Sequence, residues 1–465
     1  MERLKKSGKV IPKKSSEIKN SKIGLGFEKL DRDAFDPEKA YDKVAEIGVK
    51  KARIQSGWQK TEKQKGVYDF AWLDSIVDNF LKRGISPWLC LCYGNSLYTE
   101  KAKEYFGAVG CPPIFSEEEK QAWRNYAFET VKHYKGKISY YEIWNEPDAM
   151  YSWRHGTSGT EYGLFALDTA KAIKAADPSA KIICGALAGL QIPFLNEMLK
   201  TGVGDYVDYI SFHEYPTDET QMFSKAEACR ALFKKYAPHL ELIQGESGSQ
   251  SKFSDSGALW GGAWTQEKQA KQLARHTIAD LLINVHFMSY FSCLDMVEAL
   301  STKQGVTADD YAYFGVLGAD FDENGKSCGT YTPKKSYYVL QNIASVFAED
   351  FEVTSFPVIV KPRESRRVFG SDVTAQEVRI GGFKKDGGEI FAYWTPTDIM
   401  TTSFEGTISF EAYSEYDKIS LVDIMDGSIY EIPDSIVTRD AFGVCTFKNL
   451  PVKDTPLLLV FGDFL

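Results

Sequence analysis

Two kinds of block alternate along the chain between residue 23 and about residue 295. Short apolar runs are separated by longer amphipathic segments of helical length. Eight such runs occur, at residues 23–30, 49–57, 86–94, 138–146, 180–189, 207–215, 240–247 and 285–295. Because these runs are apolar on both faces, they predict strands of a parallel sheet that is covered on both sides.

The segments between the runs carry start and stop signals of helices. Residues 36–48 have Asp36 as an N-cap, Pro37 at the first helical position and Gly48 as a stop. Thr265 provides a similar cap for a later segment. The pattern predicts further helices at residues 70–84, 117–136, 160–178 and 265–283.

A strand followed by a helix, eight times over, predicts an α/β fold of the closed (β/α)8 TIM-barrel type. An open sheet would need fewer strands or a strand order that the sequence does not reveal. In such a barrel the loops at the carboxyl ends of the strands form the active face. Polar side chains at the ends of the apolar runs are therefore the candidates for chemistry.

The pattern changes after a predicted helix at residues 333–347, which we expect to close the barrel. Beyond it, short alternating runs are broken by turn signals, among them Asp-Gly at residues 386–387 and 426–427. This texture predicts a C-terminal β-sandwich domain. We therefore divide the chain into three parts, which are a flexible basic segment over residues 1–22, the barrel over 23–350 and the β-sandwich over 351–465.

Composition agrees with two domains, because 465 residues with 43% hydrophobic content can fill one large core and one smaller core. The formal net charge is −9, although residues 1–22 carry eight Lys and Arg against Glu2 and Glu17. The rest of the chain is therefore more acidic than the total suggests. This charge disfavours nucleic acid as a partner and suits a neutral ligand.

The first 22 residues contain no apolar stretch of seven or more, so we expect neither a signal peptide nor a membrane partner. Eight cysteines are scattered along the chain, several of them in apolar runs, and none has metal-ligand spacing with histidine. These features predict reduced thiols, a cytoplasmic location, and neither metal nor cofactor. The sequence leaves a homo-oligomer open.

Two glutamates end predicted strands. Asn145 and Glu146 close the fourth apolar run just before Pro147, and Glu246 closes the seventh in "IQGESGSQ". A buried carboxylate without a partner is costly, so we expect these side chains to face the active side of the barrel. Across it they can approach to about 5–5.5 Å, the separation at which one carboxylate attacks a sugar while the other protonates the leaving oxygen.

Two carboxylates at this spacing do not both ionise easily, so their roles must differ. Arg53 near the end of the second run, with His213 and Tyr215 at the end of the sixth, can supply positive charge and hydrogen-bond donors. If these groups point at Glu246, they hold it ionised as a nucleophile. Glu146 is then the protonated general acid, and it turns into a base once Glu246 has become an ester.

Several stretches resemble known carbohydrate-active enzymes. "EIWNEPD" followed by "GESG" is similar to the acid/base and nucleophile motifs of clan A glycoside hydrolases, which are retaining (β/α)8 enzymes. Within the clan, "KKARIQSGW", "GVYDFAWLDSIVDNFLKRGISPWLCLCYG" and "DYISFHEYP" resemble family 39, the β-xylosidase and α-L-iduronidase family. The likeness spans roughly residues 23 to 345.

The resemblance implies a retaining exo-β-glycosidase that acts on a small oligosaccharide or glycoside, with Glu146 as acid/base and Glu246 as nucleophile. It also implies that Asn145 contacts the 2-hydroxyl of the sugar. One departure is visible, since Tyr290 or Phe291 stands where clan members usually carry Trp at the end of the eighth strand. The identity of the sugar is therefore not carried over.

Aromatic residues in the predicted loops are candidates for stacking on sugar rings. They are Trp58, Trp153, Trp260 and Trp264. For each of them packing in the core is the competing interpretation. The Gly/Ser-rich stretch at residues 247–264 suits a lid or a subsite wall.

Other functions remain open at this stage. An endo-acting β-glycanase of the same clan would carry the same motifs. A carbohydrate-binding barrel without catalysis would have little need for both glutamates. A metal-dependent hydrolase would need clustered histidines, which the six dispersed histidines do not supply.

Overall fold

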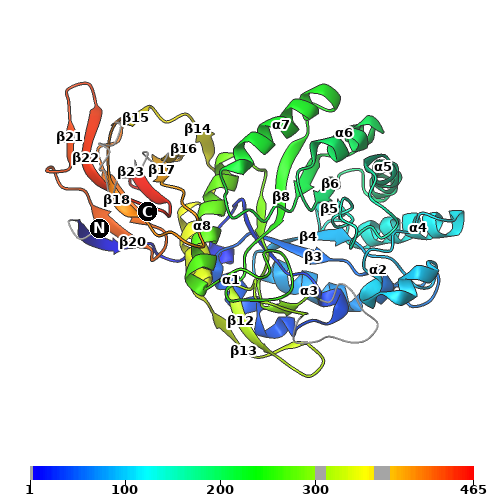
Figure 1. Cartoon of the computed structure of the whole chain (residues 1–465). Helices are drawn as coiled ribbons and strands as arrows, with labels where there is room; N and C mark the ends of the chain where they lie inside the picture. The colour runs from blue at the N-terminus through cyan, green and yellow to red at the C-terminus, as the bar shows by residue number, and fades with distance from the viewer. Residues whose placement is uncertain (1–3, 299–309, 361–377) are drawn as a thin grey trace.

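The computed structural model describes residues 4–298, 310–360 and 378–465. Its larger part is a closed parallel barrel whose strands follow one another in sequence order (Figure 1). The strands are β2 (Ile23–Gly26), β3 (Lys51–Gln55), β4 (Ser86–Leu91), β5 (Tyr140–Ile143), β6 (Lys181–Leu187), β7 (Tyr209–Phe212), β8 (Glu241–Ser247) and β9 (Met288–Tyr290). Each lies inside one of the eight apolar runs, and β2 pairs with β9. The predicted (β/α)8 barrel is confirmed.

Helices surround the barrel. They are α1 (Tyr41–Ile47), α2 (Trp58–Thr61), α3 (Ala71–Lys82), α4 (Glu117–His133), α5 (Gly159–Ala176), α6 (Ile192–Lys200), α7 (Gln221–Tyr236) and α8 (Gln266–Leu282). Thr265 caps α8 by accepting a hydrogen bond from the backbone N–H of Lys268. Asp36 caps only a 3₁₀ turn, η3 (Pro37–Lys39), and α1 begins after it. The predicted helix over residues 36–48 is therefore shorter than its start signals suggest.

A last helix, α9 (Lys335–Val346), packs against α8 and α1 and closes the ring of helices, as expected. Between β9 and α9 the described chain forms two short antiparallel pairs. They are β10 (Met296–Val297) with β11 (Tyr311–Ala312), and β12 (Leu317–Phe321) with β13 (Ser327–Pro333). Short 3₁₀ turns complete the set at η1 (Ser15–Glu17), η2 (Leu30–Arg32), η4 (Glu100–Glu104), η5 (Phe106–Ala108) and η6 (Val203–Asp205).

The C-terminal part consists of two antiparallel sheets packed face to face. The larger has the order β1-β20-β19-β23-β17-β16-β14 and the smaller β15-β18-β22-β21. Their strands are β1 (Lys5–Lys9), β14 (Glu352–Thr354), β15 (Val358–Val360), β16 (Arg379–Lys385), β17 (Gly388–Trp394), β18 (Glu405–Tyr413), β19 (Ile419–Asp423), β20 (Ser428–Glu431), β21 (Val437–Arg439), β22 (Val444–Lys453) and β23 (Leu457–Gly462). Phe391 and Phe461 of one sheet share a core with Phe410 and Phe447 of the other. Such a shared core defines a β-sandwich.

The two Asp-Gly pairs lie in hairpins, as predicted. Asp386 and Gly387 form a two-residue turn, because Lys385 pairs with Gly388 across it. The second pair lies in the turn between β19 and β20. Gly387 has a positive φ of 83°, the conformation that this tight turn requires.

The prediction of a flexible basic N-terminal segment is wrong for the described residues. Lys5–Lys9 form β1, which pairs antiparallel with β20 at the edge of the larger sheet. The N–H of Val10 extends the pairing by donating to the carbonyl of Gly427. Main-chain hydrogen bonds hold this strand while its side chains stay exposed, so no apolar pattern marks it. Lysines also suit an edge strand, because they oppose pairing with other chains.

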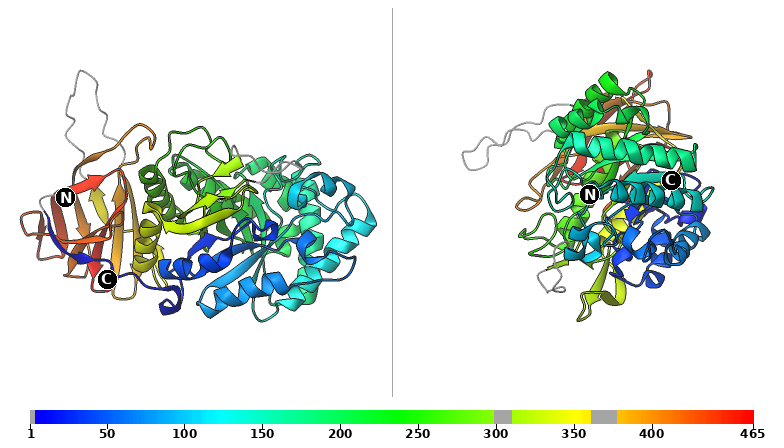
Figure 2. Two further views of the ribbon diagram at one scale, coloured as in Figure 1. Left: turned by 90° about the horizontal axis from the view of Figure 1, so that it is seen from below. Right: turned by 90° about the vertical axis from the view of Figure 1, so that its right-hand side faces the viewer.

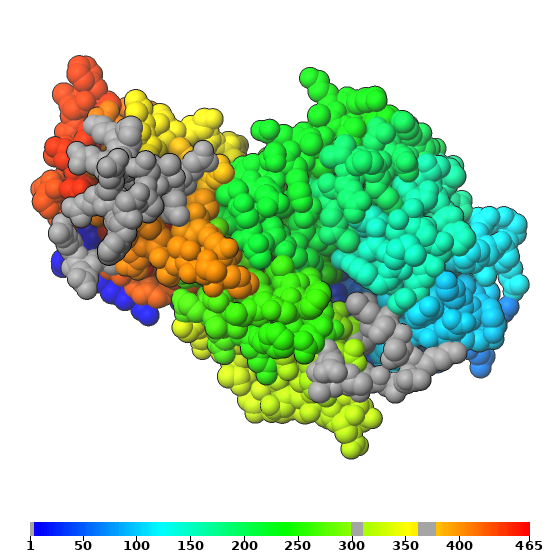
Figure 3. Space-filling view, in the orientation of Figure 1, coloured from blue at the N-terminus to red at the C-terminus, as the bar shows by residue number. Residues whose placement is uncertain are grey.

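The β-sandwich packs against α8 and α9 of the barrel, and Figures 2 and 3 show it as a second lobe beside the barrel. Glu219 at the start of α7 links the two parts. It accepts hydrogen bonds from the indole of Trp394 at 2.7 Å and from Nε of Arg275 at 2.9 Å. Arg275 also donates to the carbonyl of Thr397. Buried apolar side chains of the larger sheet continue the core of the barrel, so the lobes form one packed unit.

A search of the described residues for membrane spans finds no helix that is both long and apolar enough to cross a bilayer.

Candidate active site

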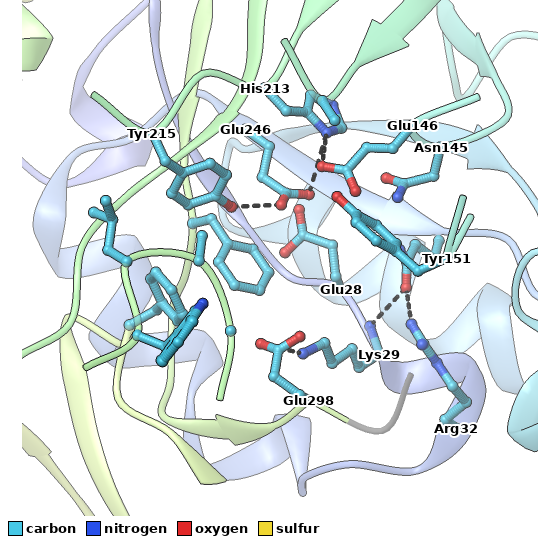
Figure 4. A pocket seen from close by; sticks show the side chains of 18 of the residues that line it. Glu28, Lys29, Arg32, Asn145, Glu146, Tyr151, His213, Tyr215, Glu246 and Glu298 are labelled. Atoms are coloured by element: carbon cyan, nitrogen blue, oxygen red, sulfur yellow. Dashed lines mark hydrogen bonds and ion pairs between the residues drawn. The ribbon is translucent and has the colours of Figure 1, made fainter. Parts of the chain in front are cut away.

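A cavity of about 520 Å³ opens at the carboxyl ends of the barrel strands. Most of the predicted site residues meet there. Asn145, Glu146, His213, Tyr215, Glu246, Trp260 and Phe291 all line it, although they come from different strands and loops (Figure 4). The predicted active face is thus also the hollowed face of the barrel.

Glu146 and Glu246 face each other inside this cavity. An oxygen of each carboxyl group lies within 4.8 Å of the other and of a ring nitrogen of His213. Their side chains are only 10% and 12% exposed, so water screens the pair poorly. This proximity suits attack by one carboxylate while the other transfers a proton, because pairs that activate a water molecule instead lie about 6.5–9.5 Å apart.

A sharp backbone turn aims Glu146 into the cavity. Strand β5 ends at Ile143, and both Trp144 and Glu146 take left-handed backbone conformations, with φ of 67° and 50°. The N–H of Glu146 is still satisfied, because it donates to the carbonyl of Ala186 at 2.8 Å. Non-glycine residues in this conformation store strain, which proteins retain mainly at functional sites.

Glu246 is held from two sides. Nη1 of Arg53 donates to its Oε2 at 2.8 Å, and the Tyr215 hydroxyl donates to its Oε1 at 2.5 Å. The preceding residue, Gly245, allows this packing, because a Cβ there would lie 2.1 Å from the hydroxyl of Ser211. Both oxygens of Glu246 therefore accept hydrogen bonds that favour its ionised form.

Arg53 lies beneath the cavity rather than on its wall. It is fully buried, and its fork of donors reaches several acceptors. Besides Glu246 it binds Glu142 through Nε at 2.7 Å and the side-chain oxygen of Asn145 through Nη2 at 2.8 Å. The amide oxygen of Asn145 is thereby occupied, which leaves the amide NH₂ group as a donor toward a ligand.

Burial changes the protonation of Glu146 and of His213. Burial raises the pKa of Glu146 to about 7, while a hydrogen bond from Tyr151 and the charge of Arg53 oppose the rise. Burial lowers the pKa of His213 to about 4, so its imidazole is neutral near neutral pH. Nδ1 of His213 lies 3.1 Å from Glu146 and 3.7 Å from Glu246. His213 therefore serves mainly Glu146, whereas the sequence suggested Glu246.

Four of the predicted stacking residues do not reach the cavity. Trp58 is buried and donates to Glu62 at 2.5 Å, Trp153 donates to Glu161 at 2.8 Å, and Trp264 donates to the carbonyl of Leu259. Tyr290 is also buried and lies outside the cavity lining, which takes Phe291 instead. These rings fill the space between the barrel, its helices and its loops, so their assignment to substrate binding is corrected.

Trp260 lines the cavity and is 71% exposed, as expected of a residue at its entrance. It lies in the loop after β8, in the stretch that the sequence suggested as a lid or subsite wall. The structure keeps Trp260 and Phe291 as candidates for contact with a ligand. Phe314, from the segment between β11 and β12, also lines the cavity.

Several charged residues of the cavity escaped the sequence analysis. Glu28, Lys29 and Arg32 follow β2 directly, and Glu298 follows β10. Lys29 binds Glu298 at 3.3 Å, and Arg32 stacks on the ring of Tyr93. The signal that found Glu146 was present here too, because Glu28 and Lys29 lie at the end of the first apolar run, in "IGLGFEKL".

Tyr151 was also missed, and it lies beside the Glu146 carboxyl in Figure 4. It comes from the loop after Pro147, where the sequence offers no periodic signal. Burial and the nearby Glu146 carboxyl raise the pKa of Tyr151, so it stays a neutral hydroxyl.

Glu146, His213 and Glu246 are also the residues that could hold a metal ion in the part of the chain that the structure describes. Such an ion would bind both carboxyl groups between which a sugar has to fit. The absence of a metal requirement stays a prediction.

Comparisons with known proteins fit this geometry. The family model described as "Glycosyl hydrolases family 39" matches residues 35–238. A "Beta-xylosidase" of Geobacillus stearothermophilus is 26% identical over 192 residues, which are 38% of this chain and 35% of that protein. A "Beta-xylosidase" of Caldicellulosiruptor saccharolyticus is 31% identical over 158 residues, which are 32% of each chain. The matched segments thus span about a third of these relatives.

Solved structures resemble the whole chain. A "monomeric beta-xylosidase from Caulobacter crescentus CB15" covers 99% of this chain and 98% of its own, with a TM-score of 0.59 and 16% identity. A "GH39 enzyme from Xanthomonas axonopodis pv. citri" covers 98% and 96%, with a TM-score of 0.60 and 15% identity. At such identities the likeness shows a shared fold, sandwich included.

Proposed function

We propose, from the match of the family model "Glycosyl hydrolases family 39" to residues 35–238, that the chain is a retaining exo-β-glycosidase acting on a small glycoside or oligosaccharide. The observation that carries the proposal is the approach of Glu146 and Glu246 to within 4.8 Å in one cavity. In this mechanism Glu246 is the nucleophile and Glu146 is the acid/base.

In the first step an oxygen of Glu246 attacks the anomeric carbon, and the bond from that carbon to the leaving oxygen breaks. Arg53 and Tyr215 donate hydrogen bonds to the two oxygens of Glu246 and hold its carboxyl group in place for the attack. Glu146, whose pKa is raised to about 7, transfers its proton to the leaving oxygen. The products of the step are a free alcohol and a glycosyl ester of Glu246.

In the second step Glu146, now ionised, takes a proton from water while the water oxygen attacks the anomeric carbon. The ester bond breaks, and Glu246 leaves as a carboxylate. Glu146 can change from an acid to a base because esterification removes the charge of Glu246. Less negative charge then surrounds the ionised Glu146. Two displacements at the same carbon restore its original configuration.

Asn145 and His213 assist from the two sides of Glu146. The amide of Asn145, fixed by Arg53, is placed to donate to the sugar hydroxyl next to the reacting carbon. Nδ1 of the neutral His213 lies 3.1 Å from Oε1 of Glu146, and this hydrogen bond orients the carboxyl group. Trp260 and Phe291 provide apolar surface for the sugar rings.

Relatives support a xyloside or xylo-oligosaccharide as the first substrate to test, because those matched include "Beta-xylosidase" and "Endo-1,4-beta-xylanase C" of Phanerodontia chrysosporium, which is 32% identical over 135 residues. The xylanase keeps endo action as the second candidate.

We also propose a reducing compartment such as the cytoplasm. All eight cysteines are free thiols, and seven of them are buried. Free thiols of this kind are typical of proteins that are not exposed to oxidising conditions.

The test combines product stereochemistry with one substitution. Proton NMR of the fresh reaction should show release of the sugar with the anomeric configuration of the substrate. Glu246→Gln keeps the shape of the side chain but removes the nucleophile, and should lower kcat on aryl β-glycosides by at least about 10⁴-fold. An inverted product would contradict the retaining mechanism. Equal, negligible rates for both proteins across a panel of aryl glycosides would favour a binding protein without catalysis.

A further inference from the structure

Glu28 is a third carboxyl group in the cavity, and the proposed mechanism does not use it. It lies two residues after the end of β2 and lines the cavity together with Glu146 and Glu246. Figure 4 shows its side chain directed toward the two glutamates. Only 1% of Glu28 is exposed, so the carboxyl group is removed from bulk water.

The hydrogen bonds available to Glu28 do not account for its burial. Its Oε1 lies 3.5 Å from Nη1 of Arg53, a long contact to a nitrogen that already serves Glu246 at 2.8 Å. Its Oε2 has no hydrogen-bond partner among the described residues. Native proteins rarely leave a buried carboxyl oxygen in this state, because the lost hydration is costly.

The backbone makes room for Glu28 at this place. A Cβ on Gly26 would lie 2.3 Å from Oε2 and 2.7 Å from Oε1 of Glu28. A glycine at the end of β2 therefore lets the carboxyl group fold back over the strand end and reach the cavity. A side chain at position 26 would displace it.

The protonation state of Glu28 suits a neutral ligand. Burial raises its pKa to about 8, the charge of Arg53 opposes the rise, and the nearby Glu246 adds to it. Near neutral pH the group is thus a carboxylic acid that donates through its O–H and accepts through its carbonyl oxygen. A sugar hydroxyl offers both complementary functions.

We propose that Glu28 binds a ring hydroxyl of the sugar held between Glu146 and Glu246, and that this contact selects which glycosides the enzyme accepts. The inference rests on the proposed glycosidase function and names a determinant of its substrate specificity. The sugar hydroxyl gives the carboxyl group a further partner besides its long contact with Arg53. Asn145, which Arg53 holds through a different nitrogen, contacts a separate hydroxyl, so one arginine fixes two recognition groups.

The competing explanation is that Glu28 only braces Arg53, and deoxy sugars separate the two roles. The experiment measures kcat/KM for the wild type, Glu28→Ala and Glu28→Gln. The substrates are the aryl β-glycoside that the wild type cleaves fastest and its 2-, 3- and 4-deoxy analogues. Glu28→Gln is the matched control, because an amide keeps one donor and one acceptor at the same place.

We expect Glu28→Ala to lose about 10- to 100-fold in kcat/KM on the parent glycoside and less than about 3-fold on the one analogue that lacks the contacted hydroxyl. Glu28→Gln should recover most of the loss. An equal loss on every analogue, or a Glu28→Gln variant as impaired as Glu28→Ala, would overturn the proposal in favour of a bracing role.

Two further measurements keep the test decisive. If Glu28→Ala does not fold, Glu28→Asp retains the acid but withdraws it by one methylene, and the same selective loss is expected. If the wild type cleaves no glycoside of the panel, the proposed function fails. An active wild type with unselective variants refutes the role of Glu28 alone.

Discussion

The interior of the barrel has two layers of opposite character. Toward the amino ends of the strands, Trp88, Ile183, Ile243 and Phe287 pack together with Tyr209 in an apolar cluster. Above it, Arg53 stands among Glu28, Glu142 and Glu246, and its guanidinium lies over the ring of Trp88 at 5.6 Å. The interior of the barrel thus contains an apolar layer and, directly above it, a cluster of charged side chains.

The apolar layer stabilises the folded protein, whereas the ionic layer lowers its stability. The apolar layer is well packed and carries no charge of its own. The ionic layer collects three carboxyl groups around one cation and leaves the buried atoms Glu28 Oε2 and Glu142 Oε1 without partners among the described residues. Polar groups in this state destabilise a fold, so their place directly beneath the cavity indicates chemistry.

The largest expected effect belongs to the polar side. Glu146→Ala should lower kcat/KM by about 10²- to 10⁴-fold for glycosides with poor leaving groups, and far less for activated aryl glycosides, because only the former need the proton. Rates with a series of phenols of rising pKa measure this. For poor leaving groups the wild-type rate should also fall as pH rises through about 7, where Glu146 loses its proton.

Glu298→Ala is the control for this experiment, since Glu298 lines the same cavity but pairs with Lys29. Any loss in that variant should be similar for all leaving groups. Equal losses in Glu146→Ala would remove Glu146 from the acid role.

The apolar side should respond in the opposite way. Ile243→Ala removes buried volume from the lower layer, and should lower the free energy of unfolding by about 2–5 kcal/mol while kcat below the melting temperature stays within about 3-fold of the wild type. Urea unfolding and steady-state kinetics at 25 °C measure the two quantities. A variant that kept its stability but lost its activity would show that the two layers are not separate in function.

The smallest expected effect concerns the free energy of unfolding, which the buried carboxyl group of Glu146 lowers when it ionises. The pKa of Glu146 is raised from 4.5 to about 7 in the folded state, so folding loses stability as pH rises through this interval. Glu146→Gln cannot ionise. Relative to the wild type, its free energy of unfolding should gain about 1–3 kcal/mol between pH 4 and pH 8.

Urea unfolding at both pH values tests this gain. Glu118→Gln, at a side chain that is 67% exposed, is the reference for replacing a glutamate on the surface. A difference between Glu146→Gln and the wild type that does not vary with pH would mean that Glu146 titrates normally.

The barrel could be predicted because each strand and helix carries its own local pattern, repeated eight times. The two glutamates could be predicted for a related reason, since the carboxyl ends of barrel strands converge by topology. Strand β1 could not, because main-chain pairing with β20 leaves no trace in side-chain pattern. The sandwich hairpins were visible through Asp386 and Gly387, which encode the turn itself.

Side-chain direction in loops is what the sequence does not encode. Trp58 and Trp260 both lie in segments that follow strands, yet one is fully buried and the other is 71% exposed. The neighbours that decide this, such as Tyr98 and Tyr126 around Trp58, are distant in sequence. Glu28 was missed for a different reason, since its strand end was visible but no second acidic motif drew attention to it.

The pairing of β1 with β20 has a consequence for the order of assembly. During synthesis, residues 5–9 emerge long before their partner strand, residues 428–431. The barrel, which lies entirely between these two strands in sequence, can fold before they pair. The pairing of β1 with β20 is then a late step, which joins an early segment of the chain to a sandwich that has already formed.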